Sequence, residues 1–359
     1  MSVAHDDSLI IRLWYEIALC AINSRASDIH IEARITGTLV RLRVDGLLQE
    51  HSHHPPELHE RLITRIKILA RLDIAEKRLP QDGRLSIGRD FSQPDIDCRV
   101  SLLPTLYGEK AVIRILPNQI EELALEQLGL LSEQLHTFKN ALSQTHGLIL
   151  VTGPTGSGKT RTLYSCLQTL NQVHRNVCSI EDPVEIRLPG INQVSYHPRA
   201  GLDFSTIIRA LLRQDPDVIM IGEIRDKASA EIAIQAAQTG HLVLSTLHTR
   251  NARGALARLY ALGIDQEAIA SCIRIISSQR LVQRICSYCQ NTKAATNDQC
   301  KHCYGTGYFG RLGVHEVLSD QQLMTPNLPY LSLYEAGLHH VQQGWIKRCT
   351  LDTEVGKWF

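Results

Sequence analysis

The sequence predicts an α/β architecture, with a parallel sheet in its larger C-terminal part and a small α+β domain before it. From residue 147 onward, apolar runs of strand length alternate with helical segments, which is the pattern of parallel βαβ units. Before residue 117, strand-like runs instead alternate polar and apolar side chains, as half-buried strands do. A chain of 359 residues with 43% hydrophobic side chains has room for two such domains.

The N-terminal domain is expected over residues 1–117. Apolar side chains spaced by three and four positions predict helices over Leu9–Ser24 and Glu57–Arg71. Asp45-Gly46 is a turn signal typical of hairpins and follows one of the alternating runs. The predicted strands are Asp28–Glu32, Thr38–Val44, Arg84–Gly88, Ile96–Leu103 and Lys110–Leu116.

A polar and acidic segment, 118–128, is expected to link this domain to a second one over 129–359. Helices are predicted over Leu131–Ser143 and Thr160–Leu170. Four apolar runs are expected to form the buried sheet: Leu148–Thr152, Val177–Ile180, Val218–Gly222 and Leu242–Thr246.

Charge and composition limit the kinds of partner that the chain is expected to bind. Lys and Arg total 38 against 37 Asp and Glu, so the chain lacks the basic excess of a nucleic-acid binder and no direct nucleic-acid partner is expected. No apolar run approaches the roughly 20 residues that span a bilayer, and the N-terminus lacks the features of a signal peptide. We therefore expect a cytoplasmic protein with reduced thiols, associated with the inner membrane only peripherally and through partners.

A phosphate-binding loop is predicted where one apolar strand ends and a helix begins. Gly153-Pro-Thr-Gly-Ser-Gly-Lys-Thr160 matches G-x-x-x-x-G-K-[ST] at every fixed position. The glycines let backbone N–H groups face a phosphate, Lys159 supplies a charge for the β- and γ-phosphates, and the Thr160 hydroxyl suits Mg²⁺. The residues expected to bind ATP here are Gly153, Pro154, Thr155, Gly156, Ser157, Gly158, Lys159, Thr160 and Arg161.

Acidic residues follow two later strands. Glu223 comes directly after Val218–Gly222 and is expected to orient or deprotonate the attacking water. Glu181-Asp-Pro-Val-Glu185 follows another strand. We expect Glu181 to contact the nucleotide site and Glu185 to act in catalysis, although a solvated turn would give the same pattern.

Two histidines flank the last predicted strand, Leu242–Thr246. His248 is expected to act in catalysis and His241 to contact the nucleotide, possible ways of sensing the γ-phosphate or bridging subunits. A purely structural role for both histidines stays open, because neither metal-ligand spacing nor a nucleophile accompanies them.

Two Cys-x-x-Cys pairs, Cys286/Cys289 and Cys300/Cys303, form a compact quartet over 286–303. Such pairs at short range suit four thiolates around a structural Zn²⁺, with no open position for a substrate. Disulfides, or a quartet without metal, are the alternatives.

These motifs together resemble the hexameric motor ATPases of type II secretion and type IV pilus assembly, over nearly the whole chain. The stretches that carry the resemblance are Ser27–Glu32, Arg41–Gly46, Ala70–Arg84, Glu181–Glu185, Leu212–Asp226 and Thr239–Thr249.

The resemblance implies a RecA-like ATPase domain after a PAS-like domain, and a homo-hexamer that binds ATP at its interfaces. It further implies that Arg41 and Arg43 approach the phosphates, and that the ring works on an inner-membrane platform protein. A tetracysteine zinc element is typical of the assembly and secretion branch. The cofactors would be ATP, Mg²⁺ and a structural Zn²⁺.

The chain departs from the family's pattern in several places. The loop expected over Gln49–Glu60 holds no arginine, Ala228 replaces a commonly acidic position, Arg250-Asn251 alters the end of the histidine motif, and the segment after Asp320 is short. These departures keep open a nucleotide-binding subunit of the same machinery with weak or no turnover. A nucleic-acid translocase on the same fold is the third hypothesis.

Overall fold

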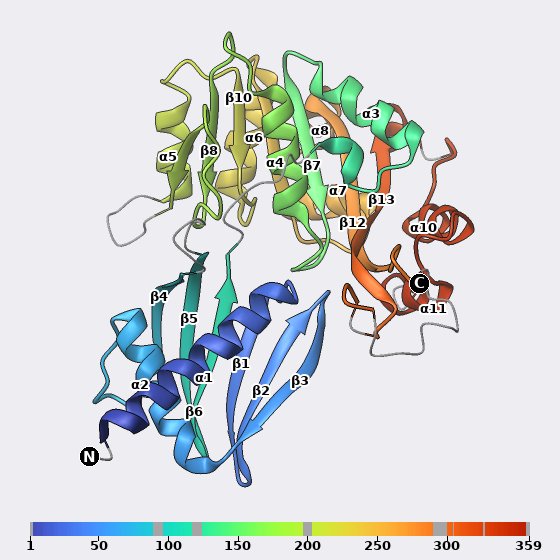
Figure 1. Cartoon of the computed structure of the whole chain (residues 1–359). Coiled ribbons are helices and arrows are strands. Elements are labelled where there is room, and N and C mark those ends of the chain that lie inside the picture. The colour runs from blue at the N-terminus through green and yellow to red at the C-terminus, as the bar shows by residue number, and fades with distance from the viewer. Residues whose placement is uncertain are drawn as a thin grey trace. The chain divides into compact units, whose positions relative to one another are not determined.

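The computed structural model describes residues 3–88, 96–116, 124–196, 203–289, 300–303, 305–325 and 327–356. The chain divides into two compact units, Met1–Ile120 and Glu121–Phe359 (Figure 1). No helix in the described ranges is long and apolar enough to cross a membrane. The predicted fold class, an α/β unit with a mostly parallel sheet, is confirmed for the second unit.

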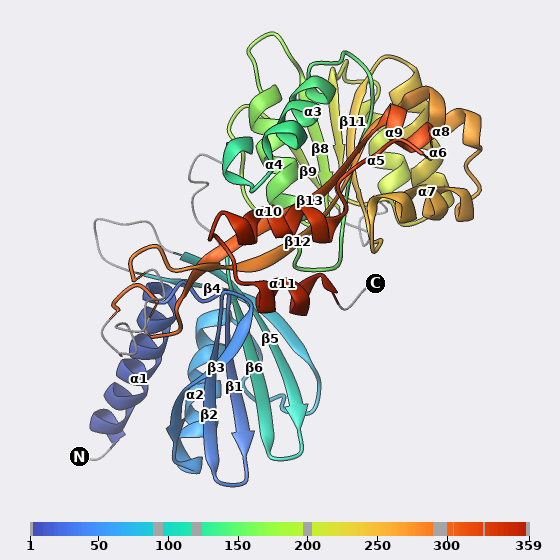
Figure 2. The ribbon, with the colours of Figure 1, turned by 90° about the vertical axis from the view of Figure 1, so that its right-hand side faces the viewer.

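The first unit is built on an antiparallel sheet of six strands in the order β3-β2-β1-β6-β5-β4. Helices α1 (Val3–Asn23) and α2 (Pro56–Ala70) cover the same face of this sheet (Figures 1 and 2). Apolar side chains such as Trp14, Ile29 and Ile66 fill the core between the sheet and the helices. The strands are β1 (Asp28–Arg34), β2 (Gly37–Val44), β3 (Leu47–His54), β4 (Gln81–Ile87), β5 (Ile96–Thr105) and β6 (Gly108–Ile115).

The expected loop over Gln49–Glu60 is the main error of prediction in this unit. Its first part lies in strand β3 and its last part in helix α2. Strand β3 is an edge strand that pairs only with β2, and its side chains are half-buried or exposed. Edge strands tolerate charged and polar residues, so β3 lacks the apolar alternation that reveals an inner strand.

The second unit contains a seven-stranded sheet in the order β13-β12-β7-β11-β10-β8-β9. All neighbouring strands run parallel except β12 and β13, which pair antiparallel. The strands are β7 (Gly147–Thr152), β8 (Val177–Glu181), β9 (Asn192–Ser195), β10 (Val218–Ile221), β11 (Leu242–Leu247), β12 (Ile273–Ile285) and β13 (Tyr308–Ser319).

Helices cover both faces of the second sheet (Figures 1 and 2). One face carries α3 (Ser132–Leu142) and α4 (Lys159–Leu170). The other carries α5 (Phe204–Leu211), α6 (Lys227–Gln238), α7 (Ala252–Ala261) and α8 (Gln266–Cys272). The last helices pack beside β12 and β13; they are α9 (Asp320–Met324), α10 (Leu333–Gln342) and α11 (Arg348–Glu354).

The segment expected to be a linker, 118–128, is partly packed. Residues 117–123 lie outside the described residues, but a 3₁₀ turn, η1, follows at Leu125–Gln127. Leu125 and Leu128 are buried, and the Leu128 carbonyl accepts a hydrogen bond from His315 on β13. The end of the segment therefore belongs to the second unit.

Candidate nucleotide site and four-cysteine centre

The predicted phosphate loop connects β7 to α4 at the carboxyl end of the parallel sheet. Gly153 and Gly158 have φ values of 145° and 89°, in the left-handed half of conformational space that favours glycine. A Cβ atom on Gly153 would also lie 2.5 Å from Ser157 Oγ. The glycine positions of the motif are therefore required by the backbone itself.

Helix α4 begins without a capping side chain. Its N-cap residue is Gly158, and no side chain accepts a hydrogen bond from the first turn. The first N–H groups of a helix have no partner inside it and carry partial positive charge, so they favour an anion. Lys159 Nζ donates to the carbonyls of Gly153 and Pro154, at 2.8 and 3.0 Å. These residues fit a phosphate group, with Lys159 held beside the loop.

The other predicted loop residues differ in exposure. Ser157 is buried, and its Oγ atom has no hydrogen-bond partner among the described residues. The exposed members are Pro154, Thr155, Gly156, Thr160 and Arg161. Thr160, in the first turn of α4, thus has a hydroxyl accessible to a metal ion.

Burial lowers the pKa of Lys159 to about 8; the carboxylate of Glu223 opposes this shift and Arg280 adds to it. An anionic phosphate favours the protonated amine, so binding raises this pKa again. The dissociation constant for ADP is therefore expected to rise as pH increases through 8, by up to about tenfold per pH unit. Titrations of ADP between pH 7 and 9.5 measure this. Lys159→Arg, which stays charged, should bind with little pH dependence, and a flat wild-type profile would contradict the assignment.

Glu223, the carboxylate predicted to orient or deprotonate water, lies just after β10 at the same edge of the sheet as the phosphate loop. Its carboxylate accepts a hydrogen bond from Arg225 Nε at 2.8 Å, and His248 Nε2 lies 3.3 Å from its other oxygen. Arg225 also reaches Asp182, with Nη1 3.3 Å from Oδ2. The structure thus joins the ends of β8, β10 and β11 in one polar network whose carboxylate is an electrostatic neighbour of Lys159.

His248 and His241 have different positions. Burial and the charge of Lys159 lower the pKa of His248, although Glu223, whose carboxylate oxygen lies 3.3 Å from His248 Nε2, opposes this. His241 instead precedes β11, and its carbonyl accepts from Gly147, the first residue of β7. Because β7 and β11 run parallel, His241 lies at the opposite edge of the sheet from the phosphate loop. The structure does not bring His241 to this site within the chain.

Glu181 and Glu185 are not brought to the loop by any described contact. Glu181 is buried at the end of β8, where its carboxylate accepts hydrogen bonds from Tyr164 on α4, from Ser179 and from Gln193. These bonds account for its burial within the fold. Glu185 is exposed and stays a prediction as a catalytic residue.

Arg41 and Arg43 lie on β2 of the first unit, on the sheet face opposite its helices. Arg41 Nη2 donates to both carboxylate oxygens of the buried Glu32, at 2.7 and 2.9 Å. Arg43 donates to the Gly46 carbonyl at 3.0 Å, and its Nε is 3.8 Å from Asp28. Both guanidinium groups are therefore held by their own unit.

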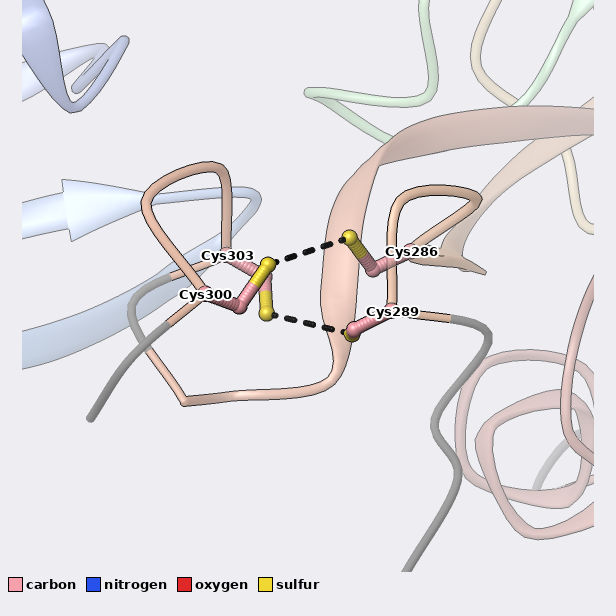
Figure 3. Close-up of side chains that lie close together, drawn as sticks. All are labelled: Cys286, Cys289, Cys300 and Cys303. Carbon is pink, nitrogen blue, oxygen red and sulfur yellow. Dashed lines mark hydrogen bonds between the residues drawn. The ribbon is translucent and has the colours of Figure 1, made fainter. Parts of the chain in front are cut away.

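The four predicted cysteines converge (Figure 3). The Sγ atoms of Cys286 and Cys300 are 3.9 Å apart, those of Cys289 and Cys303 are 3.7 Å apart, and all four lie within 4.8 Å of one another. Thiolates roughly 2.3 Å from a tetrahedral Zn²⁺ would be about 3.8 Å apart, so the donor set fits this ion. Sulfur atoms at these separations are not disulfide-bonded, so no disulfide joins the four cysteines. The segment between the two cysteine pairs, 290–299, lies outside the described residues.

Sequence reasoning missed three residues that contact the predicted site residues. Arg225 stands two positions after Glu223 in a non-helical segment, and this spacing could have suggested a shared face. Tyr164 and Gln279 come from distant parts of the chain, and their contacts have no local signal in the sequence.

A pocket of about 270 Å³ adjoins the polar network around Glu223. It is lined by Glu223, Ile224, Arg225, Leu247, His248 and Arg258.

Comparisons with known proteins identify the family to which this chain belongs. The family model described as type II/IV secretion system protein matches residues 3–342. The chain is 46% identical over 352 residues to the protein transport protein HofB homolog of Haemophilus influenzae, covering 98% of this chain and 74% of that protein. It is 43% identical over 340 residues to the type IV pilus assembly ATPase PilB of Myxococcus xanthus, covering 89% of this chain and 60% of that protein.

The fold also matches solved structures. The X-ray structure of the Legionella pneumophila ATPase DotB superposes with a TM-score of 0.72 at 20% identity, covering 94% of this chain and 93% of that one. The chain spans 60% to 74% of the length of the two relatives above. It belongs to the type II/IV secretion system protein family, the family of secretion and pilus-assembly ATPases.

Proposed function

We propose that this chain is an ATP-hydrolysing motor that powers either the assembly of a type IV pilus or pseudopilus, or type II protein secretion. The observation that carries this proposal is the placement of Glu223, which follows β10, at the same edge of the parallel sheet as the phosphate loop, where its carboxylate opposes the lowering of the Lys159 pKa. The relationship to a pilus assembly ATPase supports the same activity.

In this proposal the phosphate loop binds the triphosphate. The N–H groups at the start of α4 face the β- and γ-phosphates, and Lys159 leaves the carbonyls of Gly153 and Pro154 to bind them. The Thr160 hydroxyl is a ligand for Mg²⁺. When bound, this ion neutralises charge on the phosphate oxygens.

Glu223 is proposed to take a proton from the attacking water, or to orient that water. Arg225 and His248 hold its carboxylate from two sides, so they fix its direction without themselves touching the reacting atoms. The charge on Arg225 is shared between Glu223 and Asp182. A reorientation of Arg225 between these partners would let the site respond to the γ-phosphate.

The assembly is proposed to be a homo-hexamer. In such a ring, Arg41 and Arg43 would approach the phosphates and stabilise charge on the transferring phosphoryl group. They would then exchange their present carboxylate partners for phosphate oxygens, an exchange that suits the geometry of guanidinium groups. The partner would be an inner-membrane platform protein, and the chain would lie on the cytoplasmic side of that membrane.

The four-cysteine centre is proposed to hold one structural Zn²⁺. The sulfur separations match a tetrahedral site, and four protein ligands leave no position for a substrate.

Lys159→Ala tests the nucleotide site. Loss of the Lys159 ammonium, which the proposal pairs with the β- and γ-phosphates, is expected to lower ATP turnover by about 100-fold or more and to weaken ATP binding by at least about tenfold. Purified protein is assayed for phosphate release and for nucleotide affinity. Lys227→Ala, which removes an exposed lysine at the start of α6, should behave as the wild type.

Three outcomes separate the hypotheses. Equal turnover in wild type and Lys159→Ala would remove the support for a motor. Tight ATP binding without turnover by the wild type would favour a nucleotide-binding subunit of the same machinery. Stimulation of hydrolysis by DNA would favour a translocase.

A further inference from the structure

Gln279, on the inner strand β12, bridges the phosphate loop and the helix that follows it. Only 2% of its surface is exposed. Its Nε2 donates to the Ser157 carbonyl at 2.7 Å, and its Oε1 accepts from Thr162 Oγ1 at 2.8 Å. Gln279 is far from both residues in the sequence, so a separate strand holds the loop from outside.

The two hydrogen bonds have complementary directions. The Ser157 carbonyl can only accept a hydrogen bond, so its bond fixes which end of the Gln279 amide carries the NH₂ group. The amide oxygen must then point at Thr162, whose hydroxyl donates to it. Without the hydroxyl of Thr162, this buried oxygen would lose its partner, and the side chain that holds the Ser157 carbonyl would be less firmly anchored.

The direction of the Ser157 carbonyl determines where the loop's next donor points. In a planar trans peptide the C=O and N–H groups point in opposite directions. A carbonyl bound to Gln279 therefore aims the N–H of Gly158 away from β12, toward the inside of the loop. A phosphate held by the loop needs its N–H donors on that inner side.

Both glycines that flank the turn also pack against Gln279. A Cβ atom on Gly158 would lie 3.1 Å from Gln279 Nε2, and one on Gly153 would lie 2.6 Å from the Gln279 carbonyl. The loop thus fits the surface of β12 at both of its ends. This close approach is a second reason, besides positive φ, for glycine at these positions.

We propose that Gln279 is a positioning residue for nucleotide binding: it holds the Ser157–Gly158 peptide in the orientation that presents the Gly158 N–H to a phosphate. This inference rests on the proposed nucleotide site. It assigns no contact between Gln279 and the nucleotide.

Gln279→Leu keeps the approximate size of the side chain and removes both hydrogen bonds. ATP and ADP are expected to bind about tenfold more weakly, because the freed peptide no longer presents its N–H. KM for ATP should rise by a similar factor, while kcat at saturation falls by less than about threefold, since Glu223 and its network are unchanged. Saturating ADP should raise the melting temperature of Gln279→Leu by less than it raises that of the wild type. Each rise is measured against the nucleotide-free form of the same protein.

Thr162 supplies a second, milder test, in case Gln279→Leu folds poorly. Thr162→Val removes only the bond that anchors the amide oxygen of Gln279, so it should weaken nucleotide binding by a smaller factor, about threefold. Thr162→Ser restores the hydroxyl and should restore wild-type affinity. Ser277→Ala is the matched control, because Ser277 is buried on the same strand and its Oγ has no partner in the described part of the chain.

Nucleotide affinity for Gln279→Leu equal to that of the wild type, or reduced only as much as in Ser277→Ala, would overturn the inference. Failure of the wild type to bind or hydrolyse ATP would instead overturn the proposed function. The two failures are therefore distinguished within one set of measurements.

Discussion

Glu223→Gln is expected to lower ATP turnover by about 100-fold or more and to leave ATP affinity within about threefold of the wild type. A general base contributes roughly 10² to 10⁴ in rate, and glutamine cannot accept the proton. Its amide oxygen can still accept the hydrogen bond from Arg225, so the network that joins β8 and β10 keeps its geometry. Phosphate release at saturating ATP and nucleotide titration measure the two effects separately.

Loss of one negative charge is the trivial explanation that this experiment must exclude. Glu231→Gln serves as the control, because Glu231 is exposed on α6 of the same unit and its carboxylate pairs with the exposed Lys227 at the protein surface. It should hydrolyse ATP at the wild-type rate. Wild-type turnover by Glu223→Gln would contradict the role given to this carboxylate, and a matching loss in affinity would point instead to a contribution to binding.

The part of the site that is local in sequence could be predicted from the sequence. Strand, glycine turn and helix follow one another without interruption from β7 to α4, and Glu223 comes two positions after the end of the apolar strand β10. Each of these depends on backbone geometry within a few residues. Because β7, β11 and β10 run parallel, their carboxyl ends must then lie at one edge of the sheet.

The position of a residue relative to its strand decides whether the fold of this chain brings it to the phosphate loop. His241 precedes β11 and His248 follows it, so a parallel sheet must place them at opposite edges. Glu181 is the last residue of β8 rather than the first beyond it, and its side chain is fixed by the pleat of the strand and bonds to α4. Gln279 had no signal at all, because its contacts join segments separated by more than one hundred residues.

Replacement of Cys286 by serine is expected to abolish binding of one Zn²⁺ per chain and to lower the melting temperature of the second unit by about 10 °C. A structural zinc site contributes several kcal/mol, and each kcal/mol corresponds to roughly 2–4 °C for a unit of this size. Cys286 directly follows β12, and its N–H donates to the Gly307 carbonyl, so the centre closes the end of the β12–β13 ribbon. Metal analysis of protein prepared without chelator, and thermal unfolding, measure these effects.

The aromatic packing around the four-cysteine centre determines how much of the second unit should be destabilised when the metal is lost. Tyr288 and His302, one from each cysteine pair, stack with ring centroids 3.5 Å apart, and Phe309 contacts both edge-on. These contacts hold the two pairs together without metal, so β7 and the phosphate loop should stay folded and ADP should still bind to Cys286→Ser. Cys349→Ser, at an exposed cysteine outside the quartet, should keep both the metal and the melting temperature. Less than about half an equivalent of zinc in the wild type would contradict a metal centre, and the aromatic stack would then be the structural reason why the four cysteines converge.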